Sequence, residues 1–113
     1  MKTIYVNRAR CEYSNGKKFG SIARGDCVIY FYENGDVHLK APTSIMNRKR
    51  LISNVEIAAI KIDSFRGTRL TIWETDGTVS VYRVLRNIGK LKAPASALIP
   101  LLSAVYGGRV TSD

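Results

Sequence analysis

The sequence predicts a mainly β (α+β) fold, in which about seven antiparallel strands form a bent sandwich or partly open barrel followed by one C-terminal helix. Three observations predict it. Tight-turn signals recur along the chain, alternating apolar and β-branched runs lie between them, and an apolar stripe with helical spacing follows the last run. The turn signals are Asn15-Gly16, Asn34-Gly35, Arg66-Gly67 and Asp76-Gly77.

The first four expected strands form two hairpins, residues 3–13 with 18–23 and residues 27–32 with 36–40. Their Asn-Gly turns fit a two-residue type I′ loop, because Asn followed by Gly reaches two positive φ angles at the least steric cost. In the second hairpin such a loop sets Glu33 opposite Asp36. The expected core face then holds Tyr30, Tyr32, Val37 and Leu39, and the opposite face holds Phe31 and His38.

The next part of the chain is expected to hold three more strands. Residues 41–50 form an irregular connection, since they combine Pro42 with several polar and basic residues. Residues 51–62 resume extended structure, where a switch in apolar phase predicts a β-bulge near residues 58–60. A last hairpin joins residues 70–74 to 79–84 with Glu74 opposite Val79, which places Arg69, Trp73 and Tyr82 on one face.

A helix is expected at about residues 94–106. Pro94 suits the first helical position, and Gly107 follows the last one. Pro100 falls inside, which predicts a kink or two short turns. The apolar stripe is expected to pack on the sheet, while Ile99 and Tyr106 are candidate contacts for a homo-oligomer. The stripe consists of Leu98, Leu101, Leu102 and Val105.

The composition points to one domain over residues 1–113 without catalytic machinery. His38 is the single histidine, and the chain has no phosphate-binding glycine loop or nucleophile motif, so we expect no enzyme, no cofactor and no metal site. Cys11 and Cys27 are expected to be reduced thiols, with a disulfide as the alternative. Without a signal-peptide pattern or a membrane-spanning run, the expected location is cytoplasmic.

The charge of the chain favours an anionic partner. Its 18 Lys and Arg outnumber 9 Asp and Glu, and the excess is concentrated in residues 1–25 and 41–70. Such an excess attracts polyanions, and the sequence predicts a non-enzymatic binding module for nucleic acid. A scattered, solvated basic surface is the alternative interpretation. The candidate residues are Arg8, Arg10, Lys17, Lys18, Arg24, Arg48, Lys49 and Arg50.

A second candidate site is an aromatic platform on the last hairpin. Arg69, Trp73 and Tyr82 would share one strand face, where aromatic rings stack on bases and arginine holds phosphates. In a two-layered fold, the same rings would instead belong to the core.

A seven-strand meander closed by a C-terminal helix resembles the pleckstrin-homology-like superfold, including the GRAM-like and bacterial PH-like domains. The most similar stretch covers residues 52–102, about half of the chain. The resemblance implies the scaffold. Phosphoinositide-binding members typically carry a basic pattern across the first hairpin and a tryptophan in the final helix, whereas Lys17, Lys18 and Arg24 have another spacing and residues 94–106 contain no tryptophan.

Two alternative functions follow from this shape and charge. One is a protein-interaction or regulatory module, for instance an inhibitor, that docks on an acidic protein surface. The other is a module that binds anionic lipid.

Overall fold

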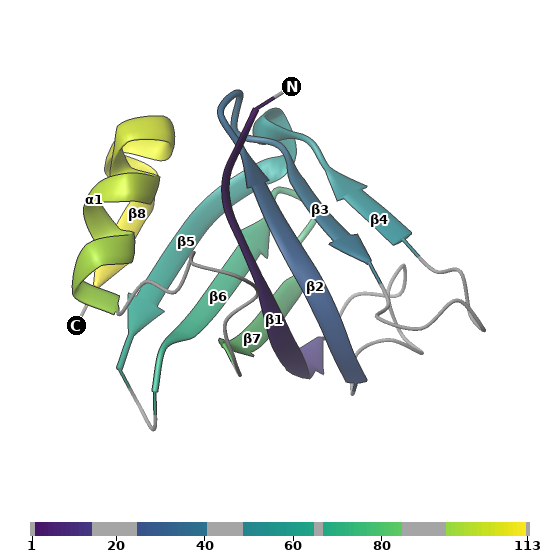
Figure 1. The fold of residues 1–113 in the computed structure, drawn as a ribbon. Coiled ribbons are helices and arrows are strands. Elements are labelled where there is room, and N and C mark those ends of the chain that lie inside the picture. Colours follow the sequence, from purple (N-terminus) through teal and green to yellow (C-terminus); the bar gives the residue numbers. More distant parts are fainter. Residues whose placement is uncertain (1, 15–24, 41–48, 65–66, 85–94, 113) are drawn as a thin grey trace.

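The computed structural model describes residues 2–14, 25–40, 49–64, 67–84 and 95–112 (Figure 1). In these ranges eight strands and one α-helix confirm the predicted fold class. Short 3₁₀ turns cover Asn54–Glu56 and Gly107–Arg109. The elements are β1 (Thr3–Ser14), β2 (Gly25–Tyr32), β3 (Val37–Lys40), β4 (Lys49–Ile52), β5 (Ile57–Asp63), β6 (Arg69–Glu74), β7 (Val79–Val84), α1 (Ala95–Tyr106) and β8 (Val110–Ser112).

The strands form one continuous sheet in the order β4-β3-β2-β1-β7-β6-β5-β8. The twelve-residue β1 lies in the middle and pairs with both β2 and β7. All neighbours are antiparallel except β5 and β8, which run parallel. The β1–β4 half lies in front of the β5–β7 half in Figure 1, and α1 lies with β8 beside β5. The sheet therefore bends over itself and does not close into a barrel.

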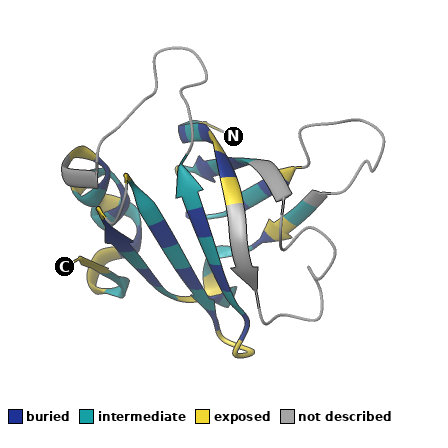
Figure 2. Cartoon of the chain, turned by 90° about the horizontal axis from the view of Figure 1, so that it is seen from below, coloured by how far each residue is buried: buried dark blue, intermediate teal, exposed yellow. Residues whose placement is uncertain are grey.

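The core lies between the two halves of the sheet (Figure 2). Helix α1 covers one side of it with Leu98, Leu102 and Tyr106, which are buried at intervals of four residues. This confirms that the helix packs on its own sheet. Pro100 occupies an exposed position inside α1, and the helix continues through it. The other fully buried side chains include Tyr5, Ile29, Phe31, Leu39, Ile60, Ile62, Leu70, Ile72 and Tyr82.

The β2–β3 hairpin has a register different from the predicted one. Phe31 pairs with Val37 and Ile29 with Leu39, and all four side chains are buried. The expected core residues Tyr30 and Tyr32 lie on the outer face with His38 and are only half-buried. Val37 and Leu39 lie in the core as predicted, so the shift of one residue exchanged the two faces of β2 alone.

The shift comes from the β2–β3 turn, whose loop has one residue more than a type I′ loop. The Tyr32 N–H donates to the carbonyl of Asp36 (3.0 Å), and the Gly35 N–H donates to the carbonyl of Tyr32 (2.9 Å). Gly35 has a φ of 88°, so the loop is a type I turn followed by a left-handed glycine. The β6–β7 turn has the same bonds around Gly77, whose φ is 92°. Asn-Gly and Asp-Gly suit both loop lengths, and the longer one forms here.

The apolar pattern predicted one extended segment over residues 51–62, but these residues do not form one. They divide into the end of β4 and most of β5, which belong to opposite halves of the sheet. The 3₁₀ turn between them is held by the Glu56 carboxylate, which accepts hydrogen bonds from the Ser53 hydroxyl (2.9 Å) and N–H (3.3 Å). The predicted bulge is confirmed, since the β5–β6 register shifts between Ile57 and Ala59. The strand expected over 18–23 lies outside the described residues, and β8 was not predicted.

Replacing Gly35 by alanine is expected to destabilise the protein more than replacing Gly77. Both glycines have positive φ, so each substitution should cost about 1–2 kcal/mol of backbone strain. A Cβ on Gly35 would also overlap the amide of Asn54, which donates to the carbonyl of Asn34 (2.8 Å), whereas the position at Gly77 is open. Urea denaturation of Gly35→Ala should therefore show a further loss of about 1 kcal/mol. Equal losses in the two variants would contradict the contact.

Candidate functional site

The outer face of β1–β4 carries two rows of side chains that are set by the strand register. In the first row, Arg8 of β1 and Lys40 of β3 both pair with Val28 of β2. The second row lies two residues further along each strand, about 7 Å away. It consists of Val6, Tyr30, His38 and Leu51, one residue from each of the four strands.

Three aromatic side chains form a connected group on this face, called here the aromatic patch: Tyr30, Tyr32 and His38. The rings of Tyr30 and Tyr32 are nearly parallel (11°), with centroids 6.4 Å apart. The His38 ring meets Tyr32 edge-on at 5.0 Å, and the Tyr32 hydroxyl lies 3.0 Å from His38 Nδ1 at hydrogen-bond distance. The Lys40 ammonium lies 5.0 Å from the centroid of the Tyr30 ring, a cation–π distance. These contacts hold the rings in fixed positions at half-buried sites.

A pocket of about 400 Å³ opens at the end of the aromatic patch. It is lined by Tyr32, Asp36, His38 and Leu51. Leu51 leaves 53% of its surface exposed, which is unusual for a strand leucine in this protein. Asp36 is held in place because its carboxylate accepts hydrogen bonds from the Asn54 N–H and the Asn34 amide, both at 3.0 Å. The pocket thus combines apolar walls with one carboxylate.

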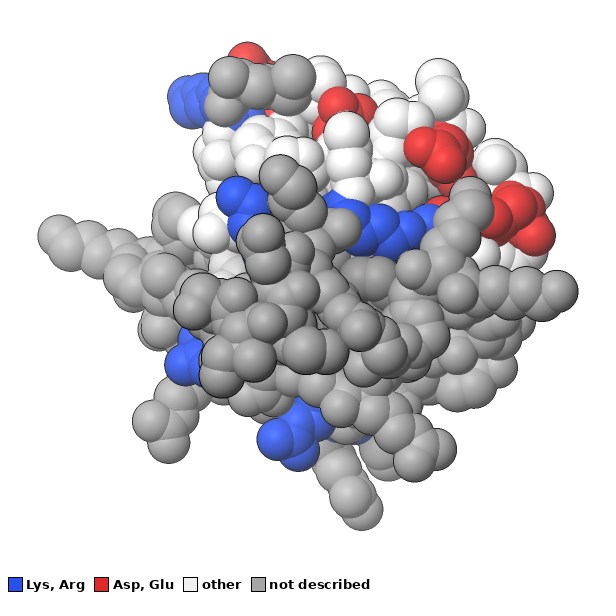
Figure 3. Space-filling model, turned by 90° about the vertical axis from the view of Figure 1, so that its right-hand side faces the viewer, with Lys and Arg blue, Asp and Glu red and all other residues white. Residues whose placement is uncertain are grey.

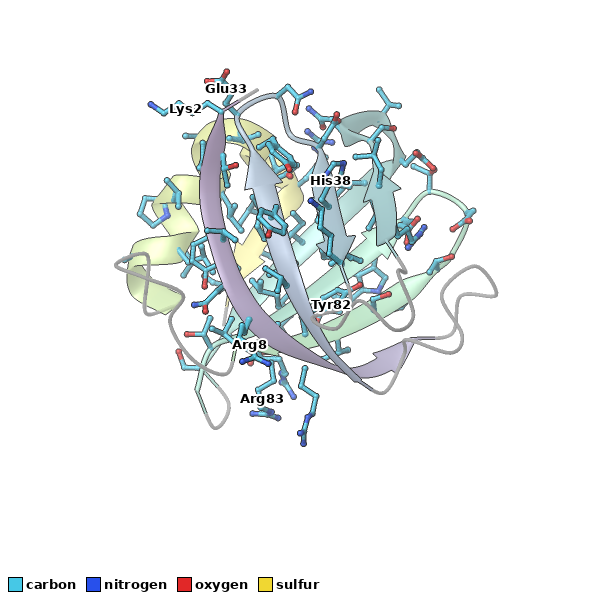
Figure 4. All side chains as sticks on the ribbon, turned by 45° about the vertical axis from the view of Figure 1, so that its right-hand side comes forward. Lys2, Arg8, Glu33, His38, Tyr82 and Arg83 are labelled. Atoms are coloured by element: carbon cyan, nitrogen blue, oxygen red, sulfur yellow. The ribbon has the colours of Figure 1, made fainter. Side chains whose placement is uncertain are left out.

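Basic side chains continue from the first row onto the second half of the sheet. Arg10 follows Arg8 on the same face of β1 and pairs with Asp26 of β2 on one side and with Arg83 of β7 on the other. Lys40, Arg8 and Arg10 are exposed and Arg83 is half-buried. We call these four residues the basic strip. Figure 4 shows Arg8 and Arg83 at the lower end of the molecule, with His38 above them and Lys2 and Glu33 at the upper end.

Acidic side chains gather in one part of the surface in the view onto the β4 side. There they run along the upper right of the surface, and most of the visible basic side chains lie below them (Figure 3). The described turns at this end carry Glu33, Asp36 and Glu56. The described outer face therefore has the basic strip on one side of the aromatic patch, and Asp36, Glu33 and Lys2 lie toward the other end.

Arg50, a predicted polyanion contact, lies between the two halves of the sheet. Both of its terminal nitrogens donate to the Glu74 carboxylate, with Nη1 at 2.6 Å from Oε2. The Arg50 and Glu74 side chains are only 11% and 2% exposed. Burial alone would lower the pKa of Arg50, but the hydrogen bonds and charge of Glu74 outweigh it and raise that pKa. Arg50 thus joins β4 to β6 and is not on the outer face.

The predicted aromatic platform is not assembled on one face. Tyr82 is fully buried and pairs with Leu70, whereas Trp73 pairs with Val79 on the other face and is half-buried. Arg69 binds the buried carboxylate of Asp63 through Nε (2.9 Å) and Nη2 (2.8 Å). The cause is the same one-residue shift as in the β2–β3 hairpin, so Trp73 and Tyr82 cannot bind one ligand together.

The other predicted contacts divide into three groups. Arg8 and Arg10 belong to the basic strip, and the backbone of Lys49 pairs with Lys40. Lys17, Lys18, Arg24 and Arg48 lie outside the described residues. Of the two candidate oligomer contacts, Ile99 packs partly against the core, and Tyr106 is 3% exposed with its hydroxyl donating to the carbonyl of Gly35 (2.8 Å).

The sequence interpretation missed Tyr30, Tyr32, Lys40 and Arg83 as outer-face residues. The signal that identifies the tyrosines is the alternation of β2, in which Ile29 and Phe31 are the more apolar set.

Two comparisons of the sequence with known proteins found no match. A scan against family models found no match, and a search of curated proteins found no similar sequence. Within the described residues, no helix is long and apolar enough to cross a bilayer.

Proposed function

We propose that this chain is a non-enzymatic binding module that engages a polyanion, namely nucleic acid, through the basic strip. The observation that carries the proposal is the register, which brings Lys40, Arg8, Arg10 and Arg83 from three strands onto one outer face. Cations arranged in this way neutralise successive phosphates and release their counterions. The PH-like resemblance and the expected cytoplasmic location belong to the same proposal.

Two further observations support it. The net charge of +9 adds a long-range attraction for any polyanion. Lys40, Arg8 and Arg10 are exposed, whereas the side chains of Arg50 and Arg69 are 11% and 30% exposed.

The test is the salt dependence of binding to fluorescein-labelled DNA and RNA, measured by fluorescence anisotropy. We expect log K to fall linearly with log salt concentration, and Arg8→Ala or Lys40→Ala to reduce the slope by about 0.7–0.9 per lost phosphate contact. Lys2→Ala is the matched control, since it removes the same charge from an exposed site at the opposite end of the molecule (Figure 4). Its slope should equal that of the parent protein.

Absence of salt-dependent binding to any nucleic acid would contradict the proposal. So would an equal loss of slope in all three variants, because the basic strip would then contribute only net charge. Retention of one acidic protein after nuclease treatment, without nucleic-acid binding, would favour the protein-docking alternative.

A further inference from the structure

We infer that the nucleic acid is single-stranded, with its phosphates on the basic strip and its bases on the aromatic patch and in the adjoining pocket. This inference rests on the proposed function and adds the class of nucleic acid and the way its bases are held.

The first argument is the preorganised aromatic surface. Tyr30 and Tyr32 have nearly parallel rings on the outer face, and the Tyr32–His38 hydrogen bond restrains two of the three rings. Stacking of bases on aromatic side chains contributes substantially to single-strand binding and needs no particular base. Rings already held in position lose little conformational entropy when a base binds.

The second argument is the spacing between rings and cations. Arg8 and Lys40 occupy the row next to Tyr30, at about 7 Å along the strands. A base stacked on Tyr30 therefore has its phosphate within reach of both cations. The Lys40 ammonium contacts the Tyr30 ring in this structure, but Lys40 is exposed and has a long flexible stem, so it can exchange the ring for a phosphate.

The third argument is the pocket at the acidic side of the patch. Its volume of about 400 Å³ lies within the range of small-ligand sites, and Tyr32 and Leu51 offer it apolar walls. The Asp36 carboxylate repels phosphate but accepts hydrogen bonds from the amino groups of bases. This charge gradient orients the strand, because its backbone must follow the basic strip while a base enters the pocket.

The same gradient disfavours a duplex. Paired bases are stacked within the helix and cannot lie against Tyr30 or enter the pocket without unpairing. A duplex placed on the basic strip would also bring its second backbone toward Asp36, which lines the pocket beyond the aromatic patch. Only the basic strip would then contribute to binding.

The experiment compares a labelled 20-mer with its own duplex at one salt concentration, in deoxyribo and ribo forms, by anisotropy. We expect the single strand to bind at least about tenfold more tightly than the duplex. Tyr30→Ala should weaken single-strand binding about 5- to 150-fold, the range for loss of one stacked base. Its salt slope should stay unchanged, because tyrosine neutralises no phosphate.

Tyr30→Phe and Tyr30→Leu separate stacking from folding. Phenylalanine keeps the aromatic ring and should restore binding, whereas leucine keeps an apolar side chain on the sheet without a π face and should not. Circular dichroism confirms that each variant is folded. The ribo and deoxyribo arms show whether the 2′-hydroxyl contributes.

The experiment distinguishes failure of this inference from failure of the proposed function. Equal affinity for single strand and duplex, with no effect of Tyr30→Leu, would overturn this inference and leave the basic strip as a general polyanion site. No salt-dependent binding to either form would overturn the proposed function as well.

Discussion

Glu74→Ala is expected to lower the free energy of unfolding by about 3–5 kcal/mol, as removal of one partner from a buried ion pair does. The substitution leaves the Arg50 guanidinium, only 11% exposed, between the halves of the sheet without its carboxylate. The pair joins β4 near one end of the sheet order to β6 near the other, so the loss should affect the whole fold. Urea denaturation followed by the fluorescence of Trp73, the single tryptophan, measures it.

The matched control replaces both partners, as Arg50→Met with Glu74→Leu. Apolar residues of similar size remove the desolvation penalty of both charges, and such replacements are often neutral or stabilising. The double variant should therefore be closer to the parent than Glu74→Ala is. A loss below about 1 kcal/mol for Glu74→Ala would show that the pair contributes no more than a surface ion pair.

The sequence predicted the fold class because turn signals and periodicity are local properties. The strands on either side of Asp76-Gly77 and the helix that ends before Gly107 were found in this way, and so was the bulge next to Ala58. Loop length is less local. Asn34-Gly35 fits a two-residue loop and the observed three-residue loop equally well, so the register could not be read from the turn alone.

The alternation of β2 could have corrected the register. Ile29 and Phe31 form a more apolar set than Tyr30 and Tyr32, whose hydroxyl groups favour a position with access to water. Ser53 and Glu56 likewise have the spacing of a capping box, which marks the break between β4 and β5. Both signals are present in the sequence. They outweigh the Asn-Gly turn and the apolar run, which predicted another register and an unbroken strand.

The ion pair of Arg50 has no comparable signal. Glu74 lies 24 residues away, and only the bend of the sheet brings the two side chains together. In the sequence alone, Arg50 cannot be distinguished from its basic neighbours. The same holds for Arg69, whose partner is Asp63. Sequence reasoning can count the positive charges of this chain, but the topology decides which of them reach the outer face.

Phe31→Ala is expected to lower the free energy of unfolding by about 3–5 kcal/mol, whereas Tyr30→Ala should lower it by about 1 kcal/mol or less. Phe31 is fully buried and lies between Tyr5 of β1 (ring centroids 6.1 Å apart) and Tyr106 of α1 (6.3 Å). Its loss opens a cavity where β1, β2 and the helix meet. Tyr30 is half-buried on the outer face, so its removal leaves no cavity.

This pair of variants tests the register of the hairpin directly, because the two residues are neighbours in the chain and point to opposite faces. With Glu33 opposite Asp36, the order of the two losses would be reversed. Urea denaturation gives the losses, and the anisotropy assay gives the second readout: Tyr30→Ala should lose single-strand affinity while remaining folded. A stable Phe31→Ala variant together with an unfolded Tyr30→Ala variant would contradict both the core and the candidate site.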